Sequence, residues 1–495
     1  MLVPPMLAAY SCLAFAFANG GGDPIEPKRG VVVREAGASE GYTLFSPLRS
    51  TKVFLVARDG AVAHEWETGV PTGAHAELQP DGSILRTARD EDNPRFSGGG
   101  LGGKLQRFAW DGELVWEFVL SDERRVMHHD FEVLPNGNVL AIVWEYVSRE
   151  DATALGRPPQ ATSERGWWPD GLVEIRPTLP KGGEIVWEWR AQDHLIQDAD
   201  PKKPNYGDVT AHPERFDLLG DVRDAPPLSA AERAEREARE REMAALGYTG
   251  GKDDAKASAK ADEPDPDWMH TNAVHYHAGY DLIVLSSPRL DEVWILDHST
   301  TTAEAKGSTG GRWKHGGDVL WRWGNPTNWG AGPKSARRLF GQHDARFVPG
   351  EKLALSIFNN GYSRPEGKWS SIDELELPFD PARGFVREAG ADFGPKELAW
   401  TYRAPEPTSF FSFFISGAER QANGNTLICS GAQGRFLEVT RAGEVVWEYL
   451  NPFGGEIEHS FGKAAAQPSK VDPNAVFRCA HYAPDHPGLA RLAAK

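Results

Sequence analysis

The sequence contains little cysteine and has a deficit of positive charge. Only three of its 495 residues are cysteine, and 54 Lys and Arg stand against 71 Asp and Glu, which gives a formal net charge of −17. Three cysteines cannot build a disulfide framework, and no Cys-x-x-Cys or Cys/His spacing suggests zinc. Because phosphate neutralisation needs a basic face, this charge argues against binding to nucleic acid or to an anionic membrane.

Long apolar runs are absent beyond the N-terminus. Residues 2–18 (LVPPMLAAYSCLAFAFA) are apolar and end in an A-x-A cleavage pattern, although no Lys or Arg precedes them. The run is too short and too interrupted to favour a membrane span. We therefore expect residues 1–18 to be a signal peptide and the protein to be periplasmic or secreted. The remaining Cys429 and Cys479 are interpreted as two buried free thiols, with one disulfide as the alternative.

Tryptophan is abundant and follows a repeat. A phrase of Gly or Lys, an acidic residue, two aliphatic residues, Trp, one residue and an aromatic occurs at 112–118, 183–189, 317–323, 396–402 and 443–449. A degraded copy occupies residues 60–66. The alternation and the aromatic end predict one strand after a Gly turn.

A second phrase alternates with the first. It has a polar start, an aliphatic strand, a tight turn, most often Asn-Gly or Asp-Gly, and another aliphatic strand, at 75–82, 129–140, 343–350 and 418–427. Asn-Gly and Asp-Gly are strong hairpin signals. With about four strands per repeat and six repeats, the pattern predicts an all-β fold, a six-bladed β-propeller over residues 41–495. A pair of β-sandwiches is the alternative.

One insertion, residues 201–266, breaks the β pattern. Ser229 and Glu232 form a capping box that opens a charged segment, polar on nearly all sides, which we expect to be helical. The low-complexity stretch that follows, from residue 250, is expected to be disordered. We interpret the insertion as a surface excursion close to the site, because it runs directly into His270.

Several histidines stand at the start of the second phrase. His129, His270 and His343 each begin an expected inner strand, His75 is a looser fourth, and Ser416 holds the equivalent place in the last repeat. Inner strands of a propeller surround its channel, so these positions should converge on the axis. A single histidine of this kind is more often structural, but three indicate a functional cluster suited to nucleophilic or acid–base chemistry.

Arg364 follows the turn at 358–363 and could supply a fixed cation. A channel with imidazoles and a guanidinium suits a tetrahedral oxyanion. Taken alone, Arg364 is equally well explained as a surface turn residue. No metal or cofactor is predicted.

Six short motifs are similar to those of the bacterial aryl-sulfate sulfotransferases (arylsulfotransferases). They are Trp268–Val274 (WMHTNAV), Leu285–Arg289 (LSSPR), Asp291–Trp294 (DEVW), Asp297–Ser299 (DHS), Gln342–Asp344 (QHD) and Asn359–Gly361 (NNG). The resemblance implies an exported six-bladed propeller that moves a sulfuryl group from an aryl sulfate to a phenol through a sulfohistidine, independently of the nucleotide donor PAPS.

Matched by position, the resemblance makes His270 and His343 supporting histidines and Arg364 the arginine. The family's nucleophilic histidine falls at Ser416-Gly417. Either His129 or His343 takes the sulfuryl group, or that blade is misaligned, or the chain is a non-catalytic propeller that binds a sulfated or phenolic ligand or a protein partner. The predicted catalytic residues are His129, His270, His343 and Arg364, and the predicted substrate-contacting residues are Asn272, Asp344, Asn360 and Ser416.

Overall fold

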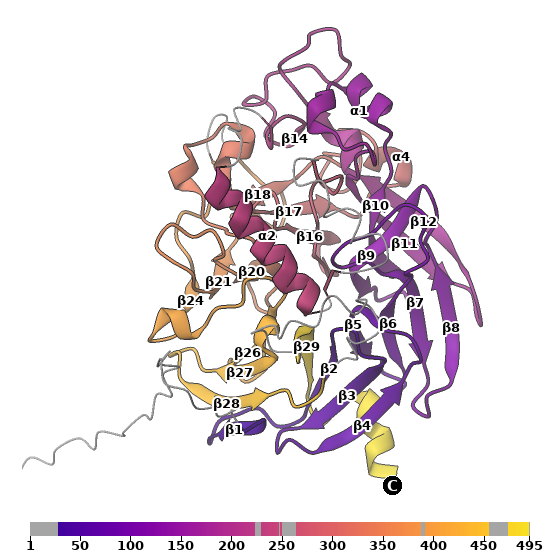
Figure 1. Ribbon diagram of the computed structural model, residues 1–495, viewed down its shortest axis with the longest axis vertical. Helices are drawn as coiled ribbons and strands as arrows, with labels where there is room; N and C mark the ends of the chain where they lie inside the picture. Colours follow the sequence, from indigo (N-terminus) through magenta and orange to yellow (C-terminus); the bar gives the residue numbers. More distant parts are fainter. Residues whose placement is uncertain are drawn as a thin grey trace, which may run out of the picture.

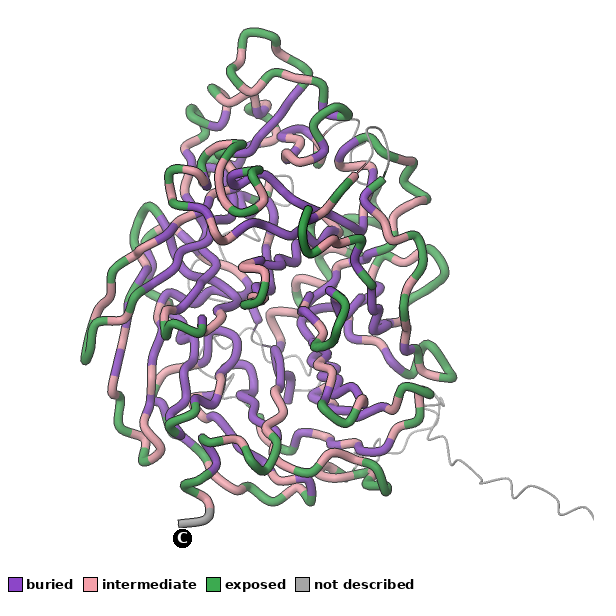
Figure 2. Tube along the Cα trace, turned by 180° about the vertical axis from the view of Figure 1, so that it is seen from behind, coloured by how far each residue is buried: buried purple, intermediate pink, exposed green. Residues whose placement is uncertain are grey.

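Six antiparallel sheets surround a common axis (Figure 1). The computed structural model describes residues 28–222, 229–246, 248–249, 264–387, 392–454 and 474–494, so the expected signal peptide lies outside the described residues. Viewed from behind, the strands are largely buried, and the exposed positions fall mainly in the loops that join them (Figure 2). The predicted six-bladed β-propeller is confirmed.

Each blade has four strands, named in order from the innermost outward. Blade 1 is β29 (Val476–Tyr482), β2 (Tyr42–Pro47), β3 (Lys52–Ala57) and β4 (Val62–Glu67). Blade 2 is β5 (Thr72–Leu78), β6 (Ile84–Arg89), β7 (Gly103–Phe108) and β8 (Leu114–Val119). Blade 3 is β9 (Arg125–Val133), β10 (Val139–Glu145), β11 (Asp170–Pro177) and β12 (Gly183–Arg190).

Blade 4 is β15 (Ala273–His277), β16 (Leu282–Ser287), β17 (Glu292–Asp297) and β18 (Trp321–Trp323). Blade 5 is β19 (His343–Phe347), β20 (Ala354–Asn359), β21 (Ser371–Glu376) and β24 (Trp400–Tyr402), with the small β22 (Phe379–Asp380) and β23 (Gly384–Phe385) beside it. Blade 6 is β25 (Gly417–Arg420), β26 (Thr426–Ser430), β27 (Arg435–Val439) and β28 (Val445–Leu450). Among the described residues, the α-helices are α1 (Arg149–Leu155), α2 (Ala230–Ala245) and α4 (Thr302–Ala305).

Both ends of the described chain close the ring. Strand β29 from the C-terminal end pairs with β2, and β1 (Gly30–Arg34) adds a fifth strand to the outer edge of blade 6. Cys429 and Cys479 are free thiols, buried in the core where blades 6 and 1 meet. Blade 1 is therefore assembled from both ends of the chain. Closing the ring of blades depends on contacts between residues that are hundreds of positions apart in the sequence.

The tryptophan repeat joins neighbouring blades at their outer strands. In every blade an indole Nε1 donates a hydrogen bond to the next blade. The six pairs are Trp66 to Ala109 O, Trp116 to Gly182 O, Trp187 to Thr300 Oγ1, Trp321 to Gly394 O, Trp400 to Arg441 O and Trp447 to Arg58 O. The last bond returns to blade 1, so the repeat phrase forms a closed ring of structural joints.

His298, from one of the six motifs, also joins two blades. Its Nδ1 lies 2.8 Å from Asp281 Oδ1 in blade 4, and its Nε2 lies 3.1 Å from Glu174 Oε2 in blade 3. Burial disfavours the imidazolium, but the hydrogen bonds to Asp281 and Glu174 outweigh it and raise the pKa of His298 to about 9. An imidazolium that is hydrogen-bonded through both nitrogens therefore bridges the two blades.

This bridge should make stability fall at alkaline pH. Because the folded pKa lies above the unfolded value, the stabilisation is complete below about pH 6.5 and is lost as the pH rises through 9. We expect a loss on the order of 3 kcal/mol in the free energy of unfolding. Urea denaturation at pH 6 and pH 9.5 measures it, and His298→Gln should remove most of this difference. An equal pH dependence in both proteins would contradict the bridge.

The insertion between blades 3 and 4 is partly packed. Residues up to 222 pair β13 (Leu195–Ile196) with β14 (Phe216–Asp217) and bury Phe216 and Leu218 against both blades. With α1 they build the tapered end at the top of Figure 1. This first part is therefore not the surface excursion expected from its polar composition, because these few apolar side chains anchor it.

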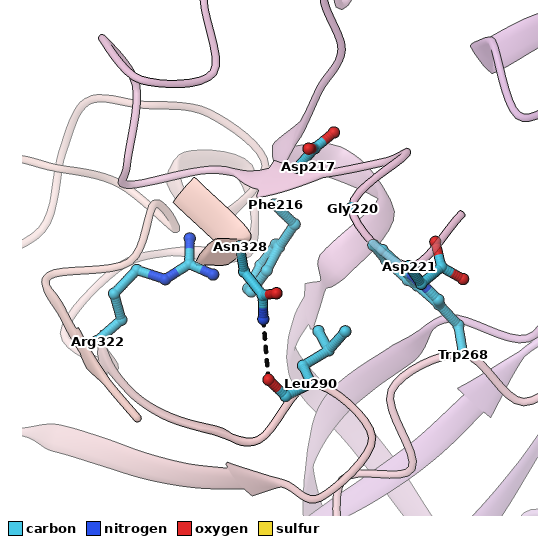
Figure 3. Close-up of a pocket in the computed structure, with 8 residues that line it drawn as sticks. All are labelled: Phe216, Asp217, Gly220, Asp221, Trp268, Leu290, Arg322 and Asn328. Carbon is cyan, nitrogen blue, oxygen red and sulfur yellow. Dashed lines mark hydrogen bonds between the residues drawn. The ribbon is translucent and has the colours of Figure 1, made fainter. Parts of the chain in front are cut away.

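A small pocket lies between this packed segment and blade 4 (Figure 3). It is lined by Phe216, Asp217, Gly220, Asp221, Trp268, Leu290, Arg322 and Asn328. Arg322 is paired with Glu292 and donates to the carbonyls of Pro213 and Arg215. The Arg322 guanidinium in this pocket therefore holds the insertion in place through its hydrogen bonds to Pro213 and Arg215.

Helix α2 begins with the predicted capping box of Ser229 and Glu232. It buries none of its own residues and crosses the middle of the propeller face in Figure 1. Glu235 forms an ion pair with Lys368 at 2.7 Å, and the Arg239 guanidinium stacks on the Tyr362 ring at 4.8 Å. These contacts hold α2 against the β20–β21 connection of blade 5.

Candidate functional site

Three of the predicted residues converge on the axis beneath α2. The rings of His129 and His270 meet edge to face at 4.4 Å, and His343 lies close enough to interact electrostatically with both. The expected common position is only partly correct: His343 begins β19, but His129 lies within β9 and His270 precedes β15. Both His129 and His270 have φ of 54°, and this left-handed kink turns the side chain out of the regular strand alternation.

His270 is oriented by a buried carboxylate. Its Nδ1 hydrogen-bonds to Asp267 Oδ2, and Trp144 Nε1 donates to Asp267 Oδ1 at 3.1 Å. Burial disfavours the carboxylate, but His270 and Arg289 nevertheless hold the pKa of Asp267 well below its usual range. An ionised Asp267 keeps the proton on His270 Nδ1, which leaves the lone pair on Nε2.

His129 is backed by a second imidazole. Its Nδ1 lies 2.7 Å from His128 Nδ1, and His128 Nε2 lies 3.4 Å from Asp170 Oδ1. Burial, followed by the charges of His270 and His128, places the pKa of His129 well below its ordinary value. A neutral His129 that donates from Nδ1 to His128 Nδ1 presents the lone pair of its Nε2.

Tyr248, which follows α2, places a phenol between the two imidazoles. Its buried Oη lies 2.7 Å from His129 Nε2 and 3.2 Å from His270 Nε2. The ring packs against Phe414 at 5.0 Å, next to buried Leu246. A continuous polar chain therefore runs from one carboxylate to the other, with the phenol oxygen at its centre. Tyr248 was not predicted from the sequence, because its contact with His129 spans 119 positions.

His343 has no free nitrogen. Asn360 donates through Nδ2 to the carbonyls of Ser412 and Ile415, so its Oδ1 accepts from His343 Nδ1 at 2.8 Å. The backbone N–H of Ile415 then donates to His343 Nε2 at 3.1 Å. Burial lowers the pKa of His343 to about 3, despite the hydrogen bond to Asn360. The neutral imidazole, hydrogen-bonded through both of its nitrogens, holds the chain at 412–415 in place.

Ser416 is also fully engaged. Its Oγ donates to Ser412 Oγ at 2.8 Å and accepts from the backbone N–H of Gly431 at 2.9 Å. Ser416 has φ of 92°, a conformation that few side chains adopt. The residue thus shapes the connection leading into β25.

Asp344 and Asn272 bind other inner strands. Asp344 Oδ2 accepts from the backbone N–H of Ala418 at 2.9 Å, and its Oδ1 lies 3.0 Å from Arg478 Nε. Asn272 Nδ2 donates to the carbonyl of Gln342 at 2.9 Å. These side chains join neighbouring blades around the channel.

Arg364 lies at the rim of the site. Its guanidinium stacks on Trp369 at 3.7 Å and donates to Ser371 Oγ at 3.2 Å. Within the described ranges, no hydrogen bond or ion pair joins Arg364 to the three histidines. Arg289 is the nearer cation: its Nη1 donates to the carbonyl of Asp267 at 2.6 Å, and its charge contributes to lowering the pKa of His129.

The structure is a β-propeller that carries a pair of imidazoles, His129 and His270, on its axis. A neutral imidazole can act as a nucleophile. The sequence matches the protein family Arylsulfotransferase (ASST) over residues 77–460, most of the chain. The protein therefore belongs to the arylsulfotransferase family, and the resemblance found in its motifs is confirmed. Membership supports aryl-sulfate sulfotransferase activity in the broad sense, with small molecules as substrates.

Solved structures with a similar chain course have low sequence identity. A protein of unknown function from Bacteroides caccae covers 89% of this chain and 98% of its own, with 10% identity and a TM-score of 0.41. Apo AztD from Citrobacter koseri covers 89% and 98%, with 7% identity and a TM-score of 0.36. A catalytically inactive virginiamycin B lyase from Staphylococcus aureus with quinupristin covers 86% and 88%, with 10% identity and a TM-score of 0.34. None of the curated proteins matches the sequence.

Membrane spans and metal clusters are both absent from the described part of the chain. No helix there has the length and apolar character needed to cross a membrane. The same residues contain no group of three or more His, Cys, Asp or Glu side chains placed to hold a metal ion.

Proposed function

We propose that this protein transfers a sulfuryl group from an aryl sulfate to a phenol, without PAPS, through one of the histidines on the propeller axis. These histidines, His129, His270 and His343, are called the axial cluster. The observation that carries the proposal is the pair of Nε2 atoms, of His129 and His270, that face one phenol oxygen from two sides. His270, which the resemblance made a supporting residue, is the better carrier on this geometry, because its Nε2 lone pair is fixed by Asp267. His343, with both nitrogens engaged, is better suited to support.

In the first half-reaction His270 Nε2 attacks sulfur, the N–S bond forms and the aryl O–S bond breaks. The aryl group leaves as a phenolate that solvent protonates, because the low pKa keeps His129 neutral at this stage. In the second half-reaction the acceptor phenol gives its proton to His129 Nε2 and attacks sulfur, and the N–S bond breaks. Because its pKa is low, His129 then releases this proton to solvent and is ready for the next acceptor.

Local positive charge stabilises the anionic group against the net charge of −17. Arg289 lies beside the Asp267–His270 pair, and the charge of Arg239 from α2 acts on Arg289. Arg289, which its ion pair with Asp265 at 2.6 Å fixes in position, can offset part of the charge on the sulfuryl oxygens in the transition state. Ionised Asp267 stabilises the positive charge that His270 gains on attack.

Brief exposure of the purified protein to a chromogenic aryl sulfate tests the proposal. Released phenol and intact mass are followed together, and we expect a gain of one or more sulfuryl groups that an added phenol removes. We also propose export to the periplasm or medium, since residues 2–18 have the pattern of a signal peptide; the same mass measurement should show a mature chain beginning at Asn19. An unprocessed chain in secreting cells would contradict export.

A binding propeller is the second candidate function. It is favoured by Ser416, which stands where the family's nucleophile is expected, and by Tyr248, which fills the space between the imidazoles. Absence of both phenol release and mass gain from folded protein would reject transfer. Binding of the unreacted aryl sulfate in calorimetry would then support this second candidate.

A further inference from the structure

Tyr248 supplies, from the chain itself, the functional group that the proposed reaction uses as acceptor. Its side chain is a phenol, its oxygen contacts both reactive Nε2 atoms, and it is 5% exposed. The neighbouring Tyr362 also lies beside α2, but its ring contacts Arg239 and Lys368 instead. Contact with the imidazoles therefore singles out Tyr248.

We propose that Tyr248 is a sulfuryl acceptor, so that the protein O-sulfates its own chain. The inference rests on the proposed function. The N–S bond of the sulfohistidine breaks, a bond forms between sulfur and Tyr248 Oη, and the phenol proton passes to His129 Nε2 at 2.7 Å. Electrons of the N–S bond return to His270, which regains its Nε2 lone pair.

Tethering favours this acceptor over a free phenol. The phenol is held by the packing of Tyr248 on Phe414 and by the Glu235–Lys368 ion pair of α2, so little freedom remains to be lost on reaction. Preorganisation of this kind gives effective concentrations far above those of dissolved phenols. Burial raises the pKa of Tyr248, so the phenol is neutral and needs the base that His129 provides.

The product is an aryl sulfate ester, the same chemical class as the donor. Transfer back to His270 is then the donor half-reaction with a tethered substrate. Sulfated Tyr248 would retain the sulfuryl group until it passes back to His270 and from there to a free phenol. In this scheme Tyr248 leaves the space between the imidazoles when an external aryl sulfate enters, and it accepts the sulfuryl group on returning to its packed position against Phe414.

The test uses the full-length mature protein with a chromogenic aryl sulfate and no added phenol. Trypsin releases residues 242–252, a peptide with one tyrosine and no histidine, so a sulfuryl group on it cannot be sulfohistidine. We expect this peptide to gain one sulfuryl group, located on Tyr248 by fragmentation. The label should be absent in Tyr248→Phe and present in Tyr362→Phe, which keeps the aromatic ring beside α2.

The result separates the two proposals. If the wild-type protein transfers sulfuryl groups to a free phenol while peptide 242–252 stays unlabelled, self-sulfation is overturned and the proposed function stands. If the label on that peptide persists in Tyr248→Phe, the acceptor is Thr249 and the proposal is also overturned. If wild-type protein releases no phenol and gains no label, both proposals fall.

Discussion

Replacing His270 by glutamine is expected to lower aryl-sulfate turnover at least about a thousandfold, because the proposed carrier is lost. The substitution keeps a side chain of similar reach that can still hydrogen-bond to Asp267. His129→Gln should cost roughly a hundredfold to ten-thousandfold, the range for loss of a general acid–base group. Initial rates of phenol release with saturating acceptor measure both effects, with thermal unfolding to verify the fold.

A matched control is His277→Gln, at the other end of β15, the strand that His270 precedes. The ring of His277 stacks on Tyr280 at 5.0 Å, and no described contact links it to the axial cluster, so turnover should not change. Asp267→Asn should lower turnover while retaining the His270 ring, because the amide no longer stabilises the imidazolium. If the sulfuryl adduct persists in His270→Gln and disappears in His129→Gln, the carrier is His129 and the assigned roles are reversed.

Replacing Arg478 by methionine should destabilise the propeller by about 3–5 kcal/mol, the cost of leaving buried charges without their partner. Arg478 Nη1 lies 3.0 Å from both carboxylate oxygens of Asp130, and Nε lies 3.0 Å from Asp344 Oδ1. Arg478 comes from β29 of blade 1, Asp130 from blade 3 and Asp344 from blade 5. Its loss would leave the buried Asp130 carboxylate without an arginine partner and would leave Asp344 with Arg346 alone, at 3.0 Å.

Urea denaturation at pH 7 measures this effect. Lys352→Met is the control, because Lys352 pairs with Glu376 at the surface at 2.6 Å and such exposed pairs contribute about 0–1 kcal/mol. Similar midpoints for the two variants would show that Arg478 is not a structural tie across the channel. Loss of turnover without loss of stability in Arg478→Met would instead point to a role in the reaction.

The sequence predicted the propeller because each repeat carries its own local signals. Asn136-Gly137 and Asn423-Gly424 specify tight turns, and alternation around Trp116 and Trp447 specifies strands, so six similar units can be counted without knowing how they meet. The capping box at Ser229 is equally local, which explains why the start of α2 was predicted correctly. Such patterns involve residues that are close along the chain.

The site was predictable only in its composition. Three histidines of the axial cluster could be chosen from their repeat positions, but their roles depend on which neighbour binds each nitrogen. His343 is occupied on both sides by Asn360 and the backbone of Ile415, and Ser416 by its own turn. The sequence places the cation at Arg364, whereas the cation beside the Asp267–His270 pair is Arg289.

By itself the sequence determined the fold class, the family and the histidines that gather on the axis, since these follow from short-range patterns repeated along the chain. Only the tertiary structure decided the tautomers, the supporting carboxylates Asp267 and Asp170, and the position of Tyr248. Those features arise from contacts between segments that are distant in sequence, where burial and hydrogen-bond partners set protonation. No local sequence pattern in the charged insertion predicts that Tyr248 lies between two imidazoles.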